Sequence, residues 1–300
     1  MDEYSLLSPQ LEKDWTASKQ DIVLFVKTFA SPRGKMYTPL SVQEEFINKM
    51  MTGQYEEGWM SGGNSAGKTW TGKWMGVYFA SHKIKPGKPA WKDYGNYMKT
   101  PYHVLCTGPE QKQAVELWEA IELAFKDSPI LRHRVDEVRT GTRLKTHPYI
   151  KLKNGTIIEA VGLHDKGRHV EGQAYDLVLI NEPPDVRSLI HCLEKVLTPR
   201  TWRRGGIICG FGTPKAKGEY WQVFRRGLRE GMSGHMVERE EPKVFSMYAD
   251  SRNNPFAEQE KISQVLNSKN ADFIRERIEG RFIDESALAF PETQVEACIK

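Results

Sequence analysis

The chain has 300 residues, 39% of them hydrophobic and 27% charged, which is ordinary globular composition. Its net charge of +4 permits a polyanionic partner but does not require one. No apolar run approaches the length that spans a bilayer, and the acidic N-terminus, MDEYSLLSPQ, lacks a signal-peptide core. The four cysteines form no C-x-x-C pair, which favours buried, reduced thiols and a cytoplasmic compartment.

The first convincing apolar element is residues 21–30, DIVLFVKTFA, and a stretch with two prolines and a glycine follows it. The next helix is predicted to begin with Ser41 as its N-cap and Glu44 closing a capping box. Gln43 offers a donor and an acceptor that could pair with the edge of an adenine, with Tyr37 flanking the base. The alternative is an ordinary surface glutamine on a helix.

Residues 58–72 read GWMSGGNSAGKTWTG and contain the phosphate-binding pattern G-x-x-x-x-G-K-[ST]. Its glycines permit turns that aim backbone N–H groups into one concavity, at the positive end of the following helix. Lys68 can reach the β- and γ-phosphates of a nucleotide, and the Thr69 hydroxyl can ligate Mg²⁺. The alternative is a glycine-rich turn with an incidental Lys-Thr. The predicted nucleotide-binding residues are Gly62, Gly63, Asn64, Ser65, Ala66, Gly67, Lys68 and Thr69.

A lysine-rich segment follows the phosphate-loop helix, with Lys85 and Lys92 among its cations and several aromatic residues between them. It could meet a nucleic-acid backbone, although a solvated loop is an equal alternative. Residues 102–107 then predict a buried strand and residues 109–126 a helix. Asn154-Gly155, between two alternating segments, predicts a β-hairpin.

Leu177 to Ile180 form a continuous apolar run of the kind found inside parallel sheets, and Asn181-Glu182 follow it directly. The end of such a strand is where a phosphate-loop NTPase holds its second acidic pair. Glu182 fits the position of the general base that polarises the attacking water. Asn181 stands where an aspartate normally holds Mg²⁺, so an amide oxygen replaces a charged ligand. The alternative is an apolar strand that ends in Asn-Glu by chance.

The remaining elements are a helix over 185–197, a strand over 207–211, a helix over 217–229 and a short strand over 244–248, and two helices that end near Gly280 follow them. Because strands alternate with helices almost throughout, we expect an α/β fold with a mostly parallel central sheet flanked by helices. The arginines after the first of these helices are candidates for weak, phosphate-directed DNA contacts. These candidates are Arg200, Arg203 and Arg204.

With these residues placed, the chain resembles the N-terminal ATPase domain of the large terminase subunit of tailed double-stranded DNA bacteriophages. GGNSAGKT resembles the family's GGNRSGKT loop, and AYDLVLINEPP resembles its FDxIWIDEEPP segment. Phe211-Gly212-Thr213-Pro214 resembles its coupling motif. Asn253-Asn254-Pro255 and residues 278–282 resemble the end of its ATPase region. The resemblance implies a P-loop NTPase of the ASCE/RecA-like class that uses ATP and Mg²⁺.

Carried over by position, the resemblance implies that Gln43 reads adenine and that Glu182 activates water. Gly212 and Thr213 would couple hydrolysis to movement. The family often completes its site with an arginine from a neighbouring subunit, in the loop before the acidic strand, and Arg168 occupies that location. Such an arginine neutralises charge in the transition state. The alternative for Arg168 is a surface loop residue.

Two positions depart from the family's pattern. Ser65 stands where many relatives have arginine. A candidate arginine from the same chain is therefore missing, and more of the charge neutralisation would fall to Arg168. Asn181 should weaken Mg²⁺ binding unless Asp176, Glu182 or the nucleotide compensates. Two other functions therefore stay open: a helicase-like nucleic-acid-dependent ATPase, and a nucleotide-binding scaffold whose Walker B site is impaired.

The resemblance divides the chain into an N-terminal, adenine-side segment (1–57), an ATPase core with a C-terminal helical subregion (58–283) and a linker (284–300). In the family a nuclease domain follows; the few scattered carboxylates of the linker predict no nuclease activity here. The expected partners are double-stranded DNA, the portal protein, the small terminase subunit and further copies of the chain in a pentameric ring, with no membrane. The expected location is the host cytoplasm, with transient docking on the procapsid and no stable place in the virion.

Overall fold

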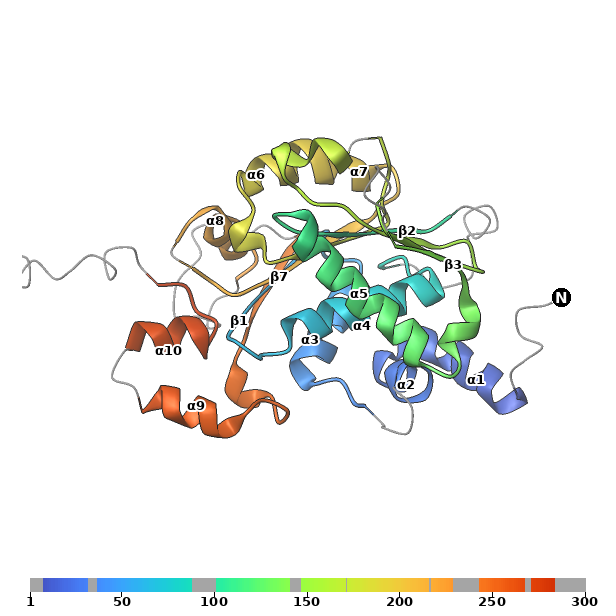
Figure 1. The fold of residues 1–300 in the computed structure, drawn as a ribbon, viewed down its shortest axis with the longest axis horizontal. Helices are drawn as coiled ribbons and strands as arrows, with labels where there is room; N and C mark the ends of the chain where they lie inside the picture. The colour runs from blue at the N-terminus through green and yellow to red at the C-terminus, as the bar shows by residue number, and fades with distance from the viewer. Residues whose placement is uncertain are drawn as a thin grey trace, which may run out of the picture.

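An eight-stranded sheet runs through the molecule in the order β3-β4-β5-β2-β6-β7-β1-β8 (Figure 1). The structure, a computed structural model, describes residues 8–31, 37–87, 101–140, 147–170, 172–215, 217–228, 243–267 and 271–283. The strands are β1 (Glu57–Gly62), β2 (His103–Thr107), β3 (Val135–Arg139), β4 (Tyr149–Leu152), β5 (Ile157–Ala160), β6 (Leu177–Asn181), β7 (Ile207–Gly212) and β8 (Val244–Ala249).

The six strands from β5 to β8 in this order pair in parallel, and β3 and β4 add an antiparallel edge. The predicted α/β fold with a mostly parallel sheet is therefore confirmed. The hairpin at Asn154-Gly155 is confirmed as well, since Gly155 takes the left-handed φ of +84° between β4 and β5. Strand β3 was not predicted; its VDEVR sequence is mostly polar because the strand lies at the exposed edge.

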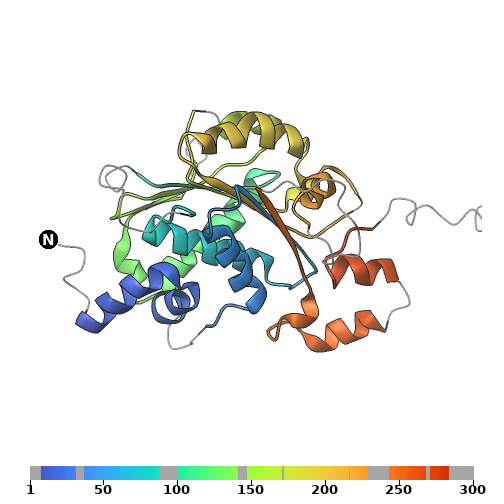
Figure 2. The same cartoon turned by 180° about the vertical axis from the view of Figure 1, so that it is seen from behind.

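Helices cover both faces of the sheet (Figures 1 and 2). Alternate residues of β6 point to opposite faces, so Leu177 and Leu179 join one hydrophobic cluster while Val178 and Ile180 join the other. The first cluster is covered by α1 (Pro9–Ala17), α2 (Ile22–Phe25), α3 (Ser41–Met51), α4 (Lys68–His82) and α5 (Gln111–Asp127). The second is covered by α6 (Leu189–His191), η6 (Cys192–Leu197), α7 (Thr198–Trp202) and α8 (Glu219–Arg225).

Two further helices, α9 (Gln259–Leu266) and α10 (Ala271–Arg277), lie together at one end of the molecule beyond β1 and β8 (Figure 1). Short helical turns complete the described chain. They are η1 (Ser18–Gln20), η2 (Val26–Ala30), η3 (Leu131–Arg134), η4 (Asp165–Val170), η5 (Pro183–Asp185) and η7 (Ser251–Asn253).

Two predicted helix starts need correction. Helix α3 begins at Ser41, but its N-cap is Leu40, and the Gln43 side chain rather than Glu44 accepts the Leu40 N–H (2.9 Å). The helix predicted from residue 185 begins only at Leu189, because the two prolines after Glu182 form the separate turn η5.

Three cysteines, Cys106, Cys192 and Cys209, are buried free thiols as predicted, and Cys298 lies outside the described residues. None of the helices in the described ranges is both long enough and apolar enough to cross a membrane.

A buried charge cluster lies at the start of β6. The Asp176 carboxylate is fully buried and lies 2.7 Å from Lys85 Nζ and 2.9 Å from Arg204 Nη1, and it accepts the His103 N–H at 2.8 Å. Lys85 is therefore a structural cation, and the prediction that it meets nucleic acid is wrong; Lys92 lies outside the described residues. The suggestion that Asp176 compensates for Asn181 is also wrong, because the two residues flank opposite ends of β6.

Asp176→Asn should destabilise the fold strongly, because it leaves Lys85 and Arg204 next to an uncharged, buried amide. Removing one partner of a buried ion pair costs about 3–5 kcal/mol, and urea unfolding would show this as a lower midpoint. Asp136→Asn is the matched control, since the Asp136–Lys151 pair (2.8 Å) is half-exposed and should matter little. Equal unfolding midpoints for the two variants would contradict the role given to Asp176.

Candidate functional site

Three neighbouring parallel strands bring the predicted site residues to one edge of the sheet. The loop predicted to bind phosphate (residues 62–69, still called the phosphate-binding loop) follows β1, Glu182 follows β6, and Thr213 follows β7. Carboxyl ends of parallel strands meet at the same edge, where open α/β sheets bind their ligands. A cavity of about 740 Å³ lies there, lined by the loop, Glu182 and Thr213, and its size suits a small-molecule ligand such as a nucleotide.

The phosphate-binding loop turns through two left-handed residues. Ser65 has a φ of +62° and Gly67 a φ of +91°. The φ of Gly67 favours glycine, and a Cβ there would lie 2.9 Å from the Gln43 Nε2, so that this side chain would have to shift. Helix α4 begins directly afterwards at Lys68, which places its positive dipole end at the cavity.

Lys68 is held inside the loop. Its ammonium group donates to the carbonyl oxygens of Gly62 (3.0 Å) and Gly63 (2.6 Å). Burial lowers the pKa of Lys68 to about 8; the negative charge of Glu182 opposes this shift and the positive charge of Arg277 adds to it. An ammonium group has three donors, so one remains for an anion in the cavity.

Glu182 takes an unusual backbone conformation for a non-glycine residue, with φ at +51°. Its N–H still donates to the Phe211 carbonyl (3.0 Å), which continues the hydrogen bonding of β6 with β7 by one residue before the turn η5 begins. The side chain then accepts the Thr213 N–H at 3.1 Å. Strain of this kind costs about 1–3 kcal/mol and is characteristic of functional residues. The predicted base and the predicted coupling residue Thr213 are therefore in direct contact.

Gly212 is predicted to act with Thr213, and it lies where β7 meets the two prolines of η5. A Cβ on Gly212 would lie 2.5 Å from Pro184 Cδ and 2.9 Å from Pro183 Cδ. Only glycine allows this approach between the end of β7 and the residues after Glu182.

The oxygens that could hold Mg²⁺ come from different elements. Thr69 and Glu182 both line the cavity and carry the hydroxyl and carboxylate oxygens that this ion prefers. Asn181 is not among the described residues that line the cavity. Its amide nitrogen donates to the Gln113 carbonyl in α5 (3.1 Å). Its role as a metal ligand stays a prediction.

Gln43 is fully buried, so the alternative of a surface glutamine is wrong. Its Oε1 accepts from the Tyr37 hydroxyl (3.2 Å) and from the Leu40 N–H (2.9 Å), and its Nε2 donates to the Gly67 carbonyl (3.1 Å). Gln43 thus ties the start of α3 to the phosphate-binding loop. It also lines the cavity, and its contact with adenine stays a prediction.

Aromatic rings form the other wall of the cavity. Tyr37 stacks on Trp70 (5.0 Å between centroids, 26° between planes) and on Phe256 (5.8 Å, 27°), and all three line the cavity. Trp70 is 41% exposed and Phe256 70% exposed, so flat apolar surface is open to a ligand. Such surface suits a purine base. The sequence does not mark Trp70 and Phe256 as site residues, because an apolar residue early in a helix is ordinary and no local pattern links Phe256 to the loop.

Residues close to the C-terminal end of the described chain hold the phosphate-binding loop in place. The Asn64 N–H donates to the Arg277 carbonyl (2.6 Å), and the Ser251 hydroxyl donates to the Asn64 carbonyl (2.6 Å). The Asn254 amide donates to the Ser65 carbonyl (2.6 Å). Asn254 also lines the cavity. The sequence marks Asn253-Asn254-Pro255 as a motif but does not indicate that it belongs to the site.

The predicted arginines do not gather at this cavity. Arg168 is exposed on η4, in the segment between β5 and β6, and it is not among the described residues that line the cavity. Arg203 is exposed, Arg200 is half-buried, and Arg204 is paired with Asp176. Their contact with DNA stays a prediction.

No protein-family model matches the chain, and no curated protein matches it. Among solved structures, the ATPase domain of the Thermus phage P74-26 large terminase is similar, with a TM-score of 0.57 and 17% identity over 82% of this chain and 95% of that one. The large terminase of bacteriophage HK97 is similar with a TM-score of 0.55 and 13% identity, over 94% of this chain and 52% of that one. The large terminase of a thermophilic bacteriophage, solved in complex with ADP, gives 0.56 and 12%, over 82% and 54%.

These similarities show that the chain has the fold of phage large-terminase ATPase domains. The chain spans about half the length of the last two of these terminases. At identities of 17% and below, the likeness concerns the fold; the activity has to be argued from the site.

The pKa of Lys68 predicts how nucleotide binding depends on pH. Bound phosphates would raise this pKa again, so binding above pH 8 requires proton uptake. We expect ATP affinity to fall by up to about tenfold per pH unit above pH 8, until the pKa of Lys68 in the complex is reached. A fluorescent ATP analogue titrated between pH 7 and 10 measures this.

Lys68→Met, which has no titratable group, should bind more weakly at pH 7 and lose this dependence. If the variant keeps the same pH dependence as the unmodified protein, another group is responsible and the assignment of Lys68 fails.

Proposed function

We propose that this chain is the ATPase of a viral DNA-packaging motor and hydrolyses ATP to move double-stranded DNA into a procapsid. The observation that carries the proposal is one cavity in which the phosphate-binding loop with Lys68 faces Glu182, while Glu182 accepts the Thr213 N–H. The terminase-like fold supports it, and the similar terminase of the thermophilic bacteriophage has been solved with ADP and with ATP-gamma-S.

In the proposed reaction, the backbone N–H groups of the loop and Lys68 bind the triphosphate, and the aromatic wall binds the base. Lys68 neutralises charge that develops on the γ-phosphate. Glu182 accepts a proton from the attacking water, a role for which its carboxylate, lining the cavity with Lys68, is suited. Mg²⁺, held by Thr69, would supply further charge neutralisation at the phosphates.

Coupling to movement is proposed to start at the Glu182–Thr213 hydrogen bond. When Glu182 turns to the attacking water, its carboxylate has to share or release the Thr213 N–H. Thr213 continues directly from β7 and leads toward α8. A change in the Glu182–Thr213 hydrogen bond would therefore move residues near α8, on the face of the sheet opposite α4.

The second candidate is a nucleotide-binding scaffold without turnover. It is favoured by Asn181, whose amide nitrogen is directed at the Gln113 carbonyl while an aspartate is usual at this position. The two functions differ in multiple-turnover phosphate release with Mg²⁺, which a scaffold would not show.

We further propose that Arg168 acts on the site of a neighbouring copy in a ring, which by resemblance is a pentamer on the portal. The exposure of Arg168 and its position outside the lining of its own chain's cavity support this. The small terminase subunit and double-stranded DNA would be further partners. The location would be the host cytoplasm, with transient docking on the procapsid.

Phosphate release tests the proposed activity. Lys68→Ala should abolish it, whereas Glu182→Gln should retain ATP binding and lose turnover by at least about 10²-fold, because an amide of the same shape cannot accept the proton. Glu194→Gln, an exposed glutamate on η6, is the matched control and should behave as the unmodified protein.

Circular dichroism should be unchanged in all three variants. Hydrolysis within tenfold of the unmodified protein in Lys68→Ala would exclude this cavity as the ATPase site. Absence of turnover in the unmodified protein, with ATP bound, would favour the scaffold.

The role of Arg168 is tested by mixing two inactive variants. Arg168→Ala should spare ATP binding and lose activity that rises more than linearly with protein concentration, because the arginine acts on the transition state. In a mixture of Arg168→Ala with Glu182→Gln, some interfaces pair an intact Glu182 with an intact Arg168, so activity should partly return. A mixture that stays inactive where the unmodified protein assembles would contradict action between subunits.

A further inference from the structure

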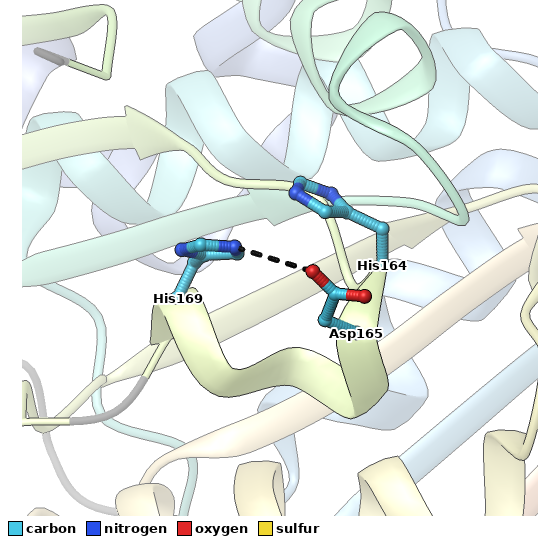
Figure 3. A group of neighbouring side chains, drawn as sticks. All are labelled: His164, Asp165 and His169. Carbon is cyan, nitrogen blue, oxygen red and sulfur yellow. Dashed lines mark ion pairs between the residues drawn. The ribbon is translucent and has the colours of Figure 1, made fainter.

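The turn after β5 brings together three side chains that can ligate a metal ion: His164, Asp165 and His169 (Figure 3). One ligand atom from each lies within 4.8 Å of the others. The two imidazole rings lie 4.7 Å apart with 38° between their planes, and the His169 Nε2 lies 3.9 Å from an Asp165 oxygen. Figure 3 shows the ribbon curling back so that the Asp165 carboxylate lies beside the two rings, next to His169.

This turn is fixed by its surroundings on both sides of the cluster. Leu163 and Val170 are buried, and the Leu163 N–H donates to the Gly108 carbonyl at 2.8 Å. The Gly167 N–H donates to the Leu163 and His164 carbonyls (3.0 and 3.2 Å). The three side chains are thus presented by an ordered turn.

The backbone of the turn is strained in a way that favours the cluster. Asp165, Lys166 and Gly167 take left-handed φ values of +53°, +58° and +77° in succession. Two of them are not glycine, and each such residue costs about 1–2 kcal/mol. This backbone conformation brings the rings of His164 and His169 next to each other and places the Asp165 side chain beside them.

One polar atom of the cluster has no partner in the described part of the chain. The Nδ1 of His164 is buried and makes no hydrogen bond there. The Nδ1 of His164 therefore still has a bond to make, and a metal-ligating histidine usually uses one ring nitrogen for the ion and the other for a hydrogen bond.

The donor set selects the class of ion. Two imidazole nitrogens and one carboxylate suit Zn²⁺ and its first-row neighbours, whereas Mg²⁺ and Ca²⁺ prefer oxygen ligands only. Bonds of about 2.0–2.1 Å require the three donors to approach one another by about 1 Å or more. Asp165 and His169 are 73% and 46% exposed, so their side chains are free to rotate inward.

We propose that His164, Asp165 and His169 bind a zinc-class transition-metal ion, with water in the fourth position, and that the ion stiffens this turn. The proposal does not depend on the ATPase function. It places the ion at the base of the segment that carries Arg168, since Arg168 lies between Asp165 and His169 in the chain. The exposed cations Lys166 and Arg168 oppose binding, but solvent screens them.

Zinc chloride titrated calorimetrically into the full, untagged, chelator-treated chain, without nucleotide or Mg²⁺, tests the proposal. We expect one ion per chain at micromolar zinc. His164→Gln and His169→Gln should each weaken binding at least about tenfold. His133→Gln, an exposed histidine on η3, is the matched control and should bind zinc as the unmodified chain does.

A second measurement separates ligation from non-specific binding. Co²⁺ in the same site should give the visible absorption of a four-coordinate ion. The variant that carries both His164→Gln and His169→Gln should lose this absorption, while its circular dichroism stays unchanged. No zinc binding by the unmodified chain, or zinc binding that survives in both histidine variants, would overturn the proposal. ATPase activity is not part of either readout, so the two proposals can fail separately.

Discussion

The parallel pairing of β6 with β7 and of β7 with β1 is the constraint on which the site depends. In this register Ser61 lies opposite Gly212, and Asn181 lies opposite Phe211, so the three strands end nearly level. The phosphate-binding loop, Glu182 and Thr213 therefore emerge side by side although they are far apart in the chain. A shift of one residue in either pairing would turn Glu182 away from the loop, because successive side chains of a strand point to opposite faces.

The phosphate-binding loop is held from two directions by segments outside β1 and α4. Gln43 reaches it from α3, and Asn254, Ser251 and the backbone of Arg277 reach it from the other side. The loop cannot change shape without disturbing at least one of these bonds. A change in the loop on ligand binding would thus be transmitted to the start of α3 and to the segment that carries α9 and α10. These two helices lie at one end of the molecule (Figure 2).

The two ends of β6 use buried charge in opposite ways. Before the strand, Asp176 is balanced by Lys85 and Arg204, an arrangement that serves the fold. Directly after the strand, Glu182 only partly compensates the buried Lys68 of α4, so burial lowers the pKa of Lys68. An incompletely balanced cation is a poor contributor to stability but a good binding group, since an anionic ligand supplies the missing charge.

The sequence by itself predicted most of the helices and strands, but not β3, and several of the residues that line the cavity. Strict residue patterns identified the phosphate-binding loop, Lys68, Thr69 and the apolar strand before Glu182, because each of these depends on local spacing and on the chemistry of a few adjacent residues. Tertiary structure alone decided which distant groups complete the cavity, namely the stacking of Phe256 and Trp70 on Tyr37 and the contact of Glu182 with Thr213. It also decided that Lys85 and Arg204 neutralise Asp176, and that Gln43 is buried against Gly67. The physical reason is that pairing between strands and burial of charge depend on residues brought together by the sheet, and local sequence patterns carry no information about that pairing.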